Sequence, residues 1–278
     1  MFTLNSRGRL LLIDRPIIMG ILNRTSDSFY SGSRVREDDA LLEHADRMIG
    51  EGADWLDIGG QSTRPGAETV GAEEELQRII GAIDLIHRRW PEIPISIDTW
   101  HARVAQEAVD AGASIVNDIS GGLLDADMLP TVGRLNVPYI CMHMKGDPAT
   151  MRAEAVYEDV VREVLDYFIR RIEECRKAGI RDIILDPGFG FAKTSEHNWQ
   201  IMRRLEVFRI PGRPLMLGVS RKSTIYRALS ATPEEALNGT TVAHTIGLLN
   251  GADILRVHDP KAAREAITLV RIYKEKGA

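Results

Sequence analysis

A sequence pattern that recurs along the chain limits its fold more than any other feature. A helical pattern ends at a glycine, and a short apolar run that finishes on polar residues follows at once. The glycines are Gly52, Gly112, Gly179 and Gly251. Glycine accepts the left-handed conformation that commonly ends a helix, and a short continuous apolar run is typical of a strand buried on both faces. The recurring pattern therefore predicts βα units and a parallel sheet.

Eight such apolar runs occur, near residues 17–22, 55–58, 94–98, 115–118, 138–142, 182–186, 214–219 and 253–257. Amphipathic stretches separate them, the clearest being 157–178, where Val160, Val164 and Phe168 share one helical face. Eight βα units predict an α/β fold, a (β/α)8 TIM barrel forming a single domain over residues 1–278. An open doubly wound sheet is the alternative, because periodicity does not show closure.

Charge and cysteine usage narrow the functional class. The net charge of -5 argues against a general nucleic-acid binder, which needs a basic face. No apolar run approaches the ~20 residues of a membrane helix, and the first segment, interrupted at Asp14, lacks the pattern of a signal peptide. Cys141 and Cys175 show no metal-type spacing and are expected to be buried thiols, which favours a cytoplasmic enzyme acting on small molecules.

Polar or charged residues follow nearly every predicted strand. In such barrels the active site lies at the C-terminal ends of the strands, so these residues are expected to share one mouth. The cationic set is Arg64, Lys222, Arg256 and His258, and the acceptor set is Asp98, Asn117 and Asp186. Guanidinium and ammonium groups suit phosphate oxygens, whereas carboxylates and an amide can bind the donor edge of a heterocycle. The predicted ligand has an anionic end and a nitrogen-rich end.

Other motifs are missing or have simpler explanations. The sequence contains no HExxH, Walker or GxGxxG motif, and 188–191 is too short for a phosphate loop. Cys141 and His143 lie two apart on one strand face, as a thiolate and its base could, but buried structural roles are expected for both. The run Glu73–Glu75 is expected to be a solvated first helical turn, where negative charge suits the helix dipole.

The strand ends resemble those of the dihydropteroate synthase family, in order and through essentially the whole chain. The matching segments are Ile18–Phe29, Asp57–Gly66, Ser96–Thr99, Asn117–Asp118, Met142–Met144, Leu185–Gly188, Ser220–Ser223 and Arg256–His258. Each segment alone is modest, but their co-occurrence is very specific. The resemblance implies condensation of (7,8-dihydropterin-6-yl)methyl diphosphate with 4-aminobenzoate, releasing diphosphate and dihydropteroate. It also implies Mg²⁺ and a homodimer.

The resemblance further implies roles for particular residues. The pterin would be held by Asp98, Asn117, Met142, Asp186, Gly218 and Lys222. The diphosphate would be held by Asn23, Arg64, Arg256 and His258, with Asn23 also at the metal. The aminobenzoate would lie among Phe29, Thr63 and Ser223, and the catalytic set would be Lys222, Asp98, Asp186 and Arg256. Sulfonamides mimic aminobenzoate in this family.

The chemistry of the residues agrees with this reaction. Diphosphate leaves readily only if fixed cations meet its growing negative charge. Mg²⁺ prefers oxygen ligands and keeps several waters, so one Asn plus substrate phosphates is a sufficient site. Carboxylates such as Asp98 and Asp186 would stabilise positive charge on the pterin as the C–O bond breaks, and the amine then attacks the carbon. No enzyme nucleophile is needed.

The first two loops depart from the commoner family pattern. Arg24 replaces a small apolar residue, Ser26 a Pro, Ser31 an Asp and Gln61 a Glu. Losing the Pro frees the backbone, so the first loop is expected to be less ordered in advance. Arg24 either contacts a phosphate or is a solvated loop residue. These changes bear on catalytic efficiency more than on the fold.

Three alternatives stay open at this point. A non-catalytic pterin-binding paralogue would bind pterin without turnover. A methyltransferase of the related pterin-binding class would not need the phosphate clamp that Lys222 and 256–258 suggest. An unrelated phosphate-binding barrel, such as an aldolase, would need a Schiff-base lysine, for which Lys222 is the only good candidate. Replacing Lys222 or Arg256 with Ala is expected to reduce turnover severely while leaving the fold intact.

Overall fold

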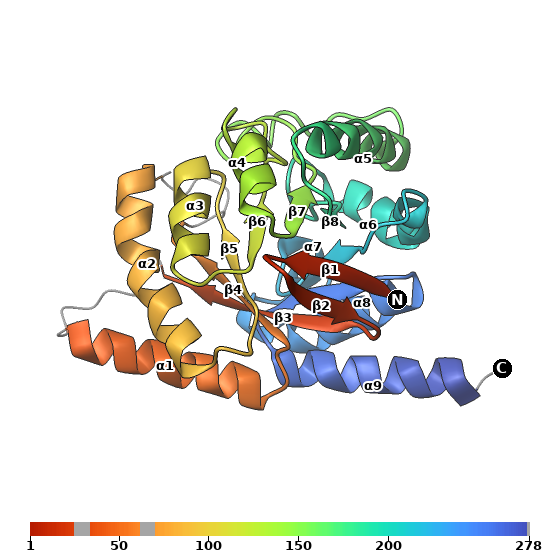
Figure 1. The fold of residues 1–278 in the computed structure, drawn as a ribbon. Coiled ribbons are helices and arrows are strands. Elements are labelled where there is room, and N and C mark those ends of the chain that lie inside the picture. Colours follow the sequence, from red (N-terminus) through yellow and green to blue (C-terminus); the bar gives the residue numbers. More distant parts are fainter. Residues whose placement is uncertain (25–33, 62–69, 277–278) are drawn as a thin grey trace.

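A computed structural model describes residues 1–24, 34–61 and 70–276, and Figure 1 shows its fold. Eight strands form one parallel sheet in the order β8-β7-β6-β5-β4-β3-β10-β9. The edges meet through a parallel bridge between Leu185 and Leu215, so the sheet closes into a barrel. The strands are β3 (Ile17–Asn23), β4 (Trp55–Gly59), β5 (Ile95–Asp98), β6 (Ile115–Asp118), β7 (Tyr139–Met142), β8 (Ile183–Asp186), β9 (Met216–Leu217) and β10 (Ile254–Val257). The TIM-barrel prediction is confirmed.

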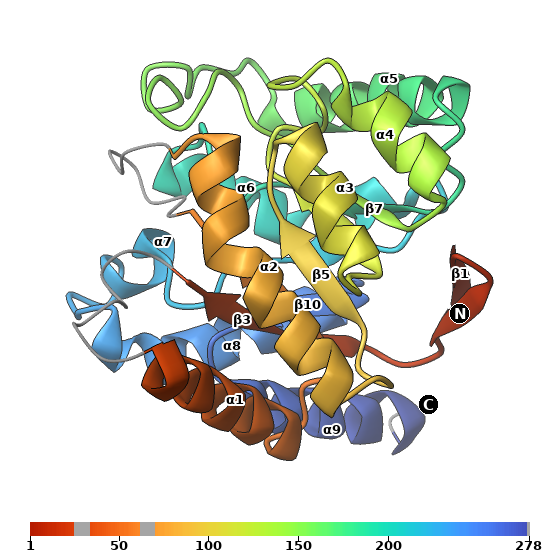
Figure 2. The same cartoon turned by 60° about the vertical axis from the view of Figure 1, so that its left-hand side comes forward.

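Helices cover the outside of the barrel, and successive helices pack side by side, as α2 and α3 do in Figure 2. They are α1 (Arg34–Gly50), α2 (Ala72–Arg89), α3 (Ala102–Asp110), α4 (Met128–Leu135), α5 (Val160–Lys177), α6 (Ser195–Arg203), α7 (Ser223–Tyr226), α8 (Leu237–Leu249) and α9 (Pro260–Lys276). The predicted helix at 157–178 corresponds to α5. It begins at Val160 because the Asp159 carboxylate accepts hydrogen bonds from the Val161 and Arg162 amides.

Strand alternation divides the interior into two layers. Residues two apart on a strand point to the same face, so alternate residues line the barrel or face the helices. The outward set, including Leu56, Ile97 and Leu185, packs with the helices in the main core. The lower inward set forms a second apolar core from Met19, Trp55, Ile115, Ile140, Ile184, Met216 and Ile254. Whatever stands two residues further along each strand therefore faces the mouth.

An antiparallel hairpin covers the N-terminal end of the barrel (Figure 1). It consists of β1 (Phe2–Ser6) and β2 (Arg9–Ile13), which pair in register from Phe2 with Ile13 to Ser6 with Arg9. Leu4, Leu11 and Ile13 join the apolar core inside the barrel, so the hairpin closes that end against water. Among the described residues, no helix combines the length and apolarity that a membrane crossing requires.

Candidate active site

A polar layer lies directly above the apolar core inside the barrel. Moving two residues along from the lower inward set replaces Trp55 with Asp57, Ile115 with Asn117 and Ile184 with Asp186. Met216 and Ile254 are followed in the same way by Gly218 and Arg256. Asp98 and Met142 end strands β5 and β7. The alternation of the parallel strands thus gathers charged and amide groups at one depth.

Arg256 is the centre of this layer. Its Nε donates to Asp57 Oδ2 at 2.6 Å, and its Nη2 donates to Asp98 Oδ2 at 2.6 Å. Asn117 Nδ2 lies 3.3 and 3.2 Å from the two carboxylate oxygens of Asp57. Both carboxylates are buried, and such charges are tolerated when they are paired and hydrogen-bonded. Arg256 therefore ties β4, β5 and β10 together across the barrel.

Asp186, Lys222 and Gly218 form the other side of the layer. A Cβ built on Gly218 would lie 3.7 Å from Asp186 Oδ2 and 4.0 Å from Lys222 Nζ, in ordinary van der Waals contact, so the bare glycine keeps side-chain bulk away from these two charges. Asp186 Oδ1 accepts a hydrogen bond from Gly188 N at 2.8 Å. Lys222 Nζ donates to the Phe189 carbonyl and lies 4.8 Å from the centroid of the Phe191 ring.

Burial shifts the titration of these groups. It lowers the pKa of Lys222 to about 8, although Asp186 opposes the shift. It raises the pKa of Asp186, against the opposing charge of Lys222. Burial also raises the pKa of Asp98, against Arg256 and with the help of Asp57. Since Arg256 stays protonated and contacts Asp98 at 2.6 Å, the pair keeps Asp98 ionised near neutral pH. Clustered perturbed groups of this kind are typical of a functional site.

The mouth above this layer carries His258 and Asn23. His258 Nδ1 lies 3.0 Å from Ser220 Oγ. Desolvation and the positive charges of Arg256 and Arg221 lower the pKa of His258 to about 4. Because His258 is exposed to solvent, the two charges are the clearer cause of this lowering. Asn23 Oδ1 lies 3.2 Å from the position of a Cβ on Gly59, and that same Cβ would lie 3.6 Å from Asp98 Oδ2. Asn23 is therefore close to the carboxylate side of the layer.

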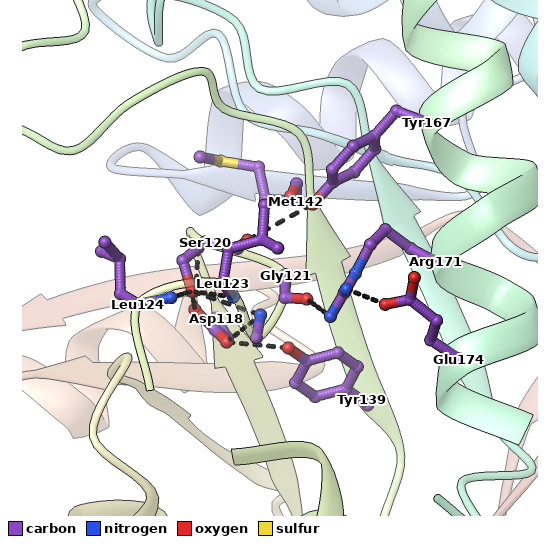
Figure 3. A network of polar contacts seen from close by, with 11 residues as sticks. Asp118, Ser120, Gly121, Leu123, Leu124, Tyr139, Met142, Tyr167, Arg171 and Glu174 are labelled. Atoms are coloured by element: carbon purple, nitrogen blue, oxygen red, sulfur yellow. Dashed lines mark hydrogen bonds and ion pairs between the residues drawn. The ribbon is translucent and has the colours of Figure 1, made fainter. Parts of the chain in front are cut away.

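A buried polar network supports the loop that follows β6 (Figure 3). Asp118 points outward from the barrel and accepts hydrogen bonds from the Tyr139 hydroxyl at 2.7 Å and from the Ser120 hydroxyl at 2.7 Å. From α5, Tyr167 donates to the carbonyl of Met142 at 2.9 Å, and Arg171 donates to the carbonyl of Gly121. These contacts hold the chain directly after Asn117 and the backbone of Met142, the two places from which these inward side chains project.

The described structure brings together ten of the thirteen residues predicted for the site, either in the polar layer or around its mouth. They are Asn23, Asp98, Asn117, Met142, Asp186, Gly218, Lys222, Ser223, Arg256 and His258. Phe29, Thr63 and Arg64, together with the departures Ser26 and Ser31, lie outside the described residues. Asp57 was given no role in the site from the sequence, although its place two residues after the inward Trp55 indicates that it lines the barrel.

Outside the polar layer, the expectation of a solvated first helical turn holds for Glu73 and Glu74 but is wrong for Glu75, and one of the two alternatives for Arg24 is removed. Glu75 is fully buried, not solvated; its Oε2 accepts hydrogen bonds from Gln61 Nε2 at 2.9 Å and Thr99 Oγ1 at 3.0 Å. Its place on the face of α2 that buries Ile79 could have indicated this. Arg24 is not a solvated loop residue, since its side chain is 14% exposed and lies 3.9 Å from Asp38. The phosphate alternative for Arg24 stays a prediction.

Cys141 and His143 have the buried structural positions that were expected. Cys141 packs in the core between barrel and helices, and both cysteines are free thiols. The side-chain hydrogen bond with Cys175 and, after it, burial raise the pKa of Cys141, so the residue lacks the lowered pKa of a thiolate nucleophile.

The donor set fits Mg²⁺ only in its loosest form of binding. Within the described part of the chain, no group of three or more His, Cys, Asp or Glu side chains is placed to hold a metal. The carboxylates nearest Asn23 are engaged by Arg256. An amide oxygen at Asn23, with waters and substrate oxygens completing the shell, is consistent with how Mg²⁺ binds when it accompanies phosphates.

The barrel and its polar layer define a class: a (β/α)8 enzyme that receives a small ligand at the C-terminal ends of its strands. The family model described as pterin binding enzyme matches residues 19–258, which include every described site residue. The chain is 42% identical over 267 residues to the dihydropteroate synthase of Escherichia coli K12, spanning 95% of this chain and 94% of that protein. The chain belongs to the dihydropteroate synthase family of pterin-binding enzymes.

Two further relatives agree. The folic acid synthesis protein fol1 of Schizosaccharomyces pombe is 44% identical over 271 residues, but this chain spans only 37% of that longer protein. The crystal structure of the Xanthomonas albilineans dihydropteroate synthase matches with a TM-score of 0.90 and 38% identity, covering 98% of both chains. The fold similarity therefore extends over nearly the entire chain.

Proposed function

We propose that this chain synthesises 7,8-dihydropteroate by condensing (7,8-dihydropterin-6-yl)methyl diphosphate with 4-aminobenzoate and releasing diphosphate. The observation that carries the proposal is the polar layer inside the barrel, which gathers Asp57, Asp98, Asp186 and Lys222 and in which Gly218 places no side chain against Asp186 and Lys222. Structures of the related X. albilineans enzyme hold 4-aminobenzoic acid and 7,8-dihydropteroate, which supports the same substrate classes here. A related Yersinia pestis enzyme is described in a sulfonamide drug complex, so this chain is expected to be a sulfonamide target.

The pterin is assigned to the polar layer. Its ring would lie beside Gly218, where a side chain would otherwise occupy the space, with Met142 as an apolar contact. Asp186 and Asn117 would bind its edge, and Lys222 would donate to a ring acceptor. Asp98 and Asp186 would stabilise the positive charge that develops on the pterin as its C–O bond breaks. The carbon then passes to the amine through a carbocation-like transition state, and no covalent enzyme intermediate forms.

The diphosphate is assigned to the mouth, between Arg256, His258 and Asn23, with Arg64 as a further cation. Arg256 reaches the polar layer on one side and approaches the mouth on the other, which lets one guanidinium respond to charge at both ends of the breaking bond. His258 would gain a proton when the dianion binds beside it, because negative charge raises the pKa of an imidazole. Mg²⁺ held by Asn23 and substrate oxygens would neutralise phosphate charge when bound.

The aminobenzoate is assigned to Phe29, Thr63 and Ser223. Ser223 is the first residue of α7 and directly follows Lys222, so it lies at the same mouth. With the pterin below and the amine above, the reacting nitrogen and carbon would meet over Lys222. The family match at 19–258 lies inside the single domain that we assign to residues 1–278.

The test is diphosphate release from the pterin diphosphate with Mg²⁺, measured with and without 4-aminobenzoate, alongside chromatography of the pteroate product. Release that depends on the amine and yields dihydropteroate supports the synthase. Pterin binding by calorimetry without amine-dependent release would instead identify a non-catalytic pterin-binding protein. Lys222→Ala and Arg256→Ala should each reduce turnover severely in folded protein.

We also propose that the protein is located in the cytoplasm and forms a homodimer. Two free, buried thiols suit a reducing compartment. On α8, Val242, Ile246 and Leu249 are exposed, and on the adjacent α9 Leu269 and Tyr273 are exposed. An apolar face across two packed helices suits a second copy of the chain.

A further inference from the structure

Lys193 is a buried lysine that the reaction does not use. Its Nζ lies 2.9 Å from His143 Nδ1 and 3.1 Å and 3.0 Å from the carbonyl oxygens of Gly188 and Phe191. The His143 carbonyl is a fourth partner at 3.3 Å. Within the described residues, Lys193 forms no ion pair with a carboxylate. Its partners are therefore backbone oxygens and one imidazole, gathered from β7 and from the turn after β8.

The turn that Lys193 holds has an unusual backbone. Gly188, Gly190 and Ala192 are all left-handed, with φ of 70°, 82° and 48°. Such a conformation is strained for alanine and needs support from the surroundings. A Cβ on Gly188 would lie 2.1 Å from the His143 carbonyl, so the turn also approaches β7 too closely for any side chain there. The Tyr157 hydroxyl adds one anchor, to the Ala192 carbonyl at 2.9 Å.

The opposite side of the same turn faces the active site. Lys222 donates to the Phe189 carbonyl, and its Nζ lies over the Phe191 ring. A Cβ on Gly190 would lie 3.4 Å from Lys222 Cδ, which places the turn against the length of the Lys222 side chain. Carbonyls of this one turn therefore accept from two different lysines: those of Gly188 and Phe191 from Lys193, and that of Phe189 from Lys222. One turn is held between two ammonium groups.

We propose that Lys193 is a positioning residue that fixes Lys222 for pterin binding through the Gly188–Ala192 turn. The proposal rests on the assignment of the pterin to Lys222. An apolar side chain of similar length could fill the same volume without the cost of burying an amine. The array of carbonyl acceptors explains why an amine is present, since ammonium has three donors and no acceptor. Burial lowers the pKa of Lys193, and the negative charge of Asp186 opposes this shift.

A double-mutant cycle read out by pterin affinity tests the proposal. Affinity is measured by calorimetry with the pterin diphosphate in the absence of amine, so no turnover is required. Lys193→Gln should weaken binding about tenfold, but by less than about twofold in a Lys222→Ala background, because residues that act through one another are not additive. Asn117→Ala is the matched control, since Asn117 is assigned to the pterin but does not touch the turn. There, Lys193→Gln should again weaken binding about tenfold.

Thermal unfolding of each variant separates positioning from general stability. A merely structural Lys193 would lower affinity by the same factor in all three backgrounds, and that result overturns the proposal. Where Lys193→Gln does not fold, His143→Leu removes one of the four partners of Nζ and should give the same pattern with a smaller effect. If Lys222→Ala alone leaves pterin affinity unchanged, the pterin assignment itself is wrong and the proposal falls with it, which distinguishes the two failures.

Discussion

Lys222 shows at the scale of one residue how burial sets a working pH range. Burial lowers its pKa to about 8, and the negative charge of Asp186 opposes this lowering. The protonated amine is the form that can donate to the pterin and balance Asp186. That form predominates below pH 8 and is lost as pH rises through the pKa. Activity that depends on charged Lys222 should therefore decline on the alkaline side.

We predict that kcat/KM falls about tenfold per pH unit above pH 8, since kcat/KM reports the ionisation of the free enzyme. Lys222→Arg provides the control, because a guanidinium does not deprotonate in this range. Its residual kcat/KM, measured from pH 6 to 10, should lack the alkaline decline. An identical decline in both proteins would assign the limb to another group.

Asp57 marks the boundary of what the sequence predicts at this scale. Asp98, Asn117 and Asp186 could be predicted because each is a polar residue at the end of a short apolar run, and such a run is a local pattern. The contact between Asp57 and Arg256 joins residues 199 positions apart on neighbouring sides of a closed sheet. The pairing depends on barrel closure and side-chain length, neither of which a strand pattern contains. The carbonyl cage around Lys193 could not be anticipated either, because it depends on the left-handed backbone of the turn after β8.

At the scale of the element, Glu75 connects helix α2 to the second loop. Its carboxylate accepts hydrogen bonds from Gln61 Nε2 and Thr99 Oγ1. The Val70 amide, where the described chain resumes after that loop, in turn donates to Gln61 Oε1 at 3.3 Å. Burial raises the pKa of Glu75 from 4.5 to about 7. The folded state thus binds a proton more tightly than the unfolded state, so stability decreases as pH rises from about 4.5 to 7.

We predict that Glu75→Gln removes most of this loss. Wild-type protein should lose up to about 3 kcal/mol of unfolding free energy between pH 5 and 8 from this group, at 1.4 kcal/mol per pKa unit. Urea unfolding at the two pH values measures the difference. Glu74→Gln is the matched control, because Glu74 is its neighbour in the same turn but is 56% exposed. An equal pH dependence in Glu75→Gln and wild type would contradict the prediction.

Two glycines at the ends of neighbouring strands test the site against the scaffold. A Cβ on Gly218 makes ordinary contacts, the nearest at 3.7 Å, whereas a Cβ on Gly188 would clash at 2.1 Å in a left-handed residue. Gly218→Ala should keep the melting temperature within a few degrees yet weaken pterin binding about tenfold, because the methyl occupies ligand space. Gly188→Ala should be destabilised by more than about 2 kcal/mol. Unchanged pterin affinity in Gly218→Ala would move the pterin elsewhere.

The elements themselves were predicted unevenly. The predicted strand ends were accurate to within two residues because a glycine and an apolar run are both local signals. The N-terminal hairpin was missed, although Arg7 and Gly8 are left-handed with φ of 51° and 93°, a pattern typical of a tight hairpin turn. Glu75 was wrongly expected to be solvated because it belongs to an acidic run, although its position on α2 places it on the buried face of the helix. Periodicity, when it conflicts with composition, is the better guide to burial here.

At the scale of the molecule, the residues that stabilise the barrel and the residues of the candidate site lie at different depths along the barrel axis. The hairpin and the lower inward residues form a dry apolar core, and the polar layer lies above it. The buried charges are therefore anchored on strands whose other ends are fixed, which preserves their geometry without a ligand. The helices contribute by the same division: α5 supports the loop after β6, whereas α8 and α9 keep apolar residues on their outer faces.

The outer face of α8 and α9 leads to the last prediction, that two copies associate through it. Val242, Ile246 and Leu249 recur at helical spacing on α8, so a charge among them should oppose association by being buried without a partner. Val242→Glu should convert a particle of twice 31.0 kDa to one of 31.0 kDa in light scattering after size exclusion. Ile169→Glu on α5 is the matched control, because Ile169 is 53% exposed and Val242 is 54% exposed, and this variant should still associate. Association lost in both variants would indicate nonspecific destabilisation, and association retained in Val242→Glu would place the interface elsewhere.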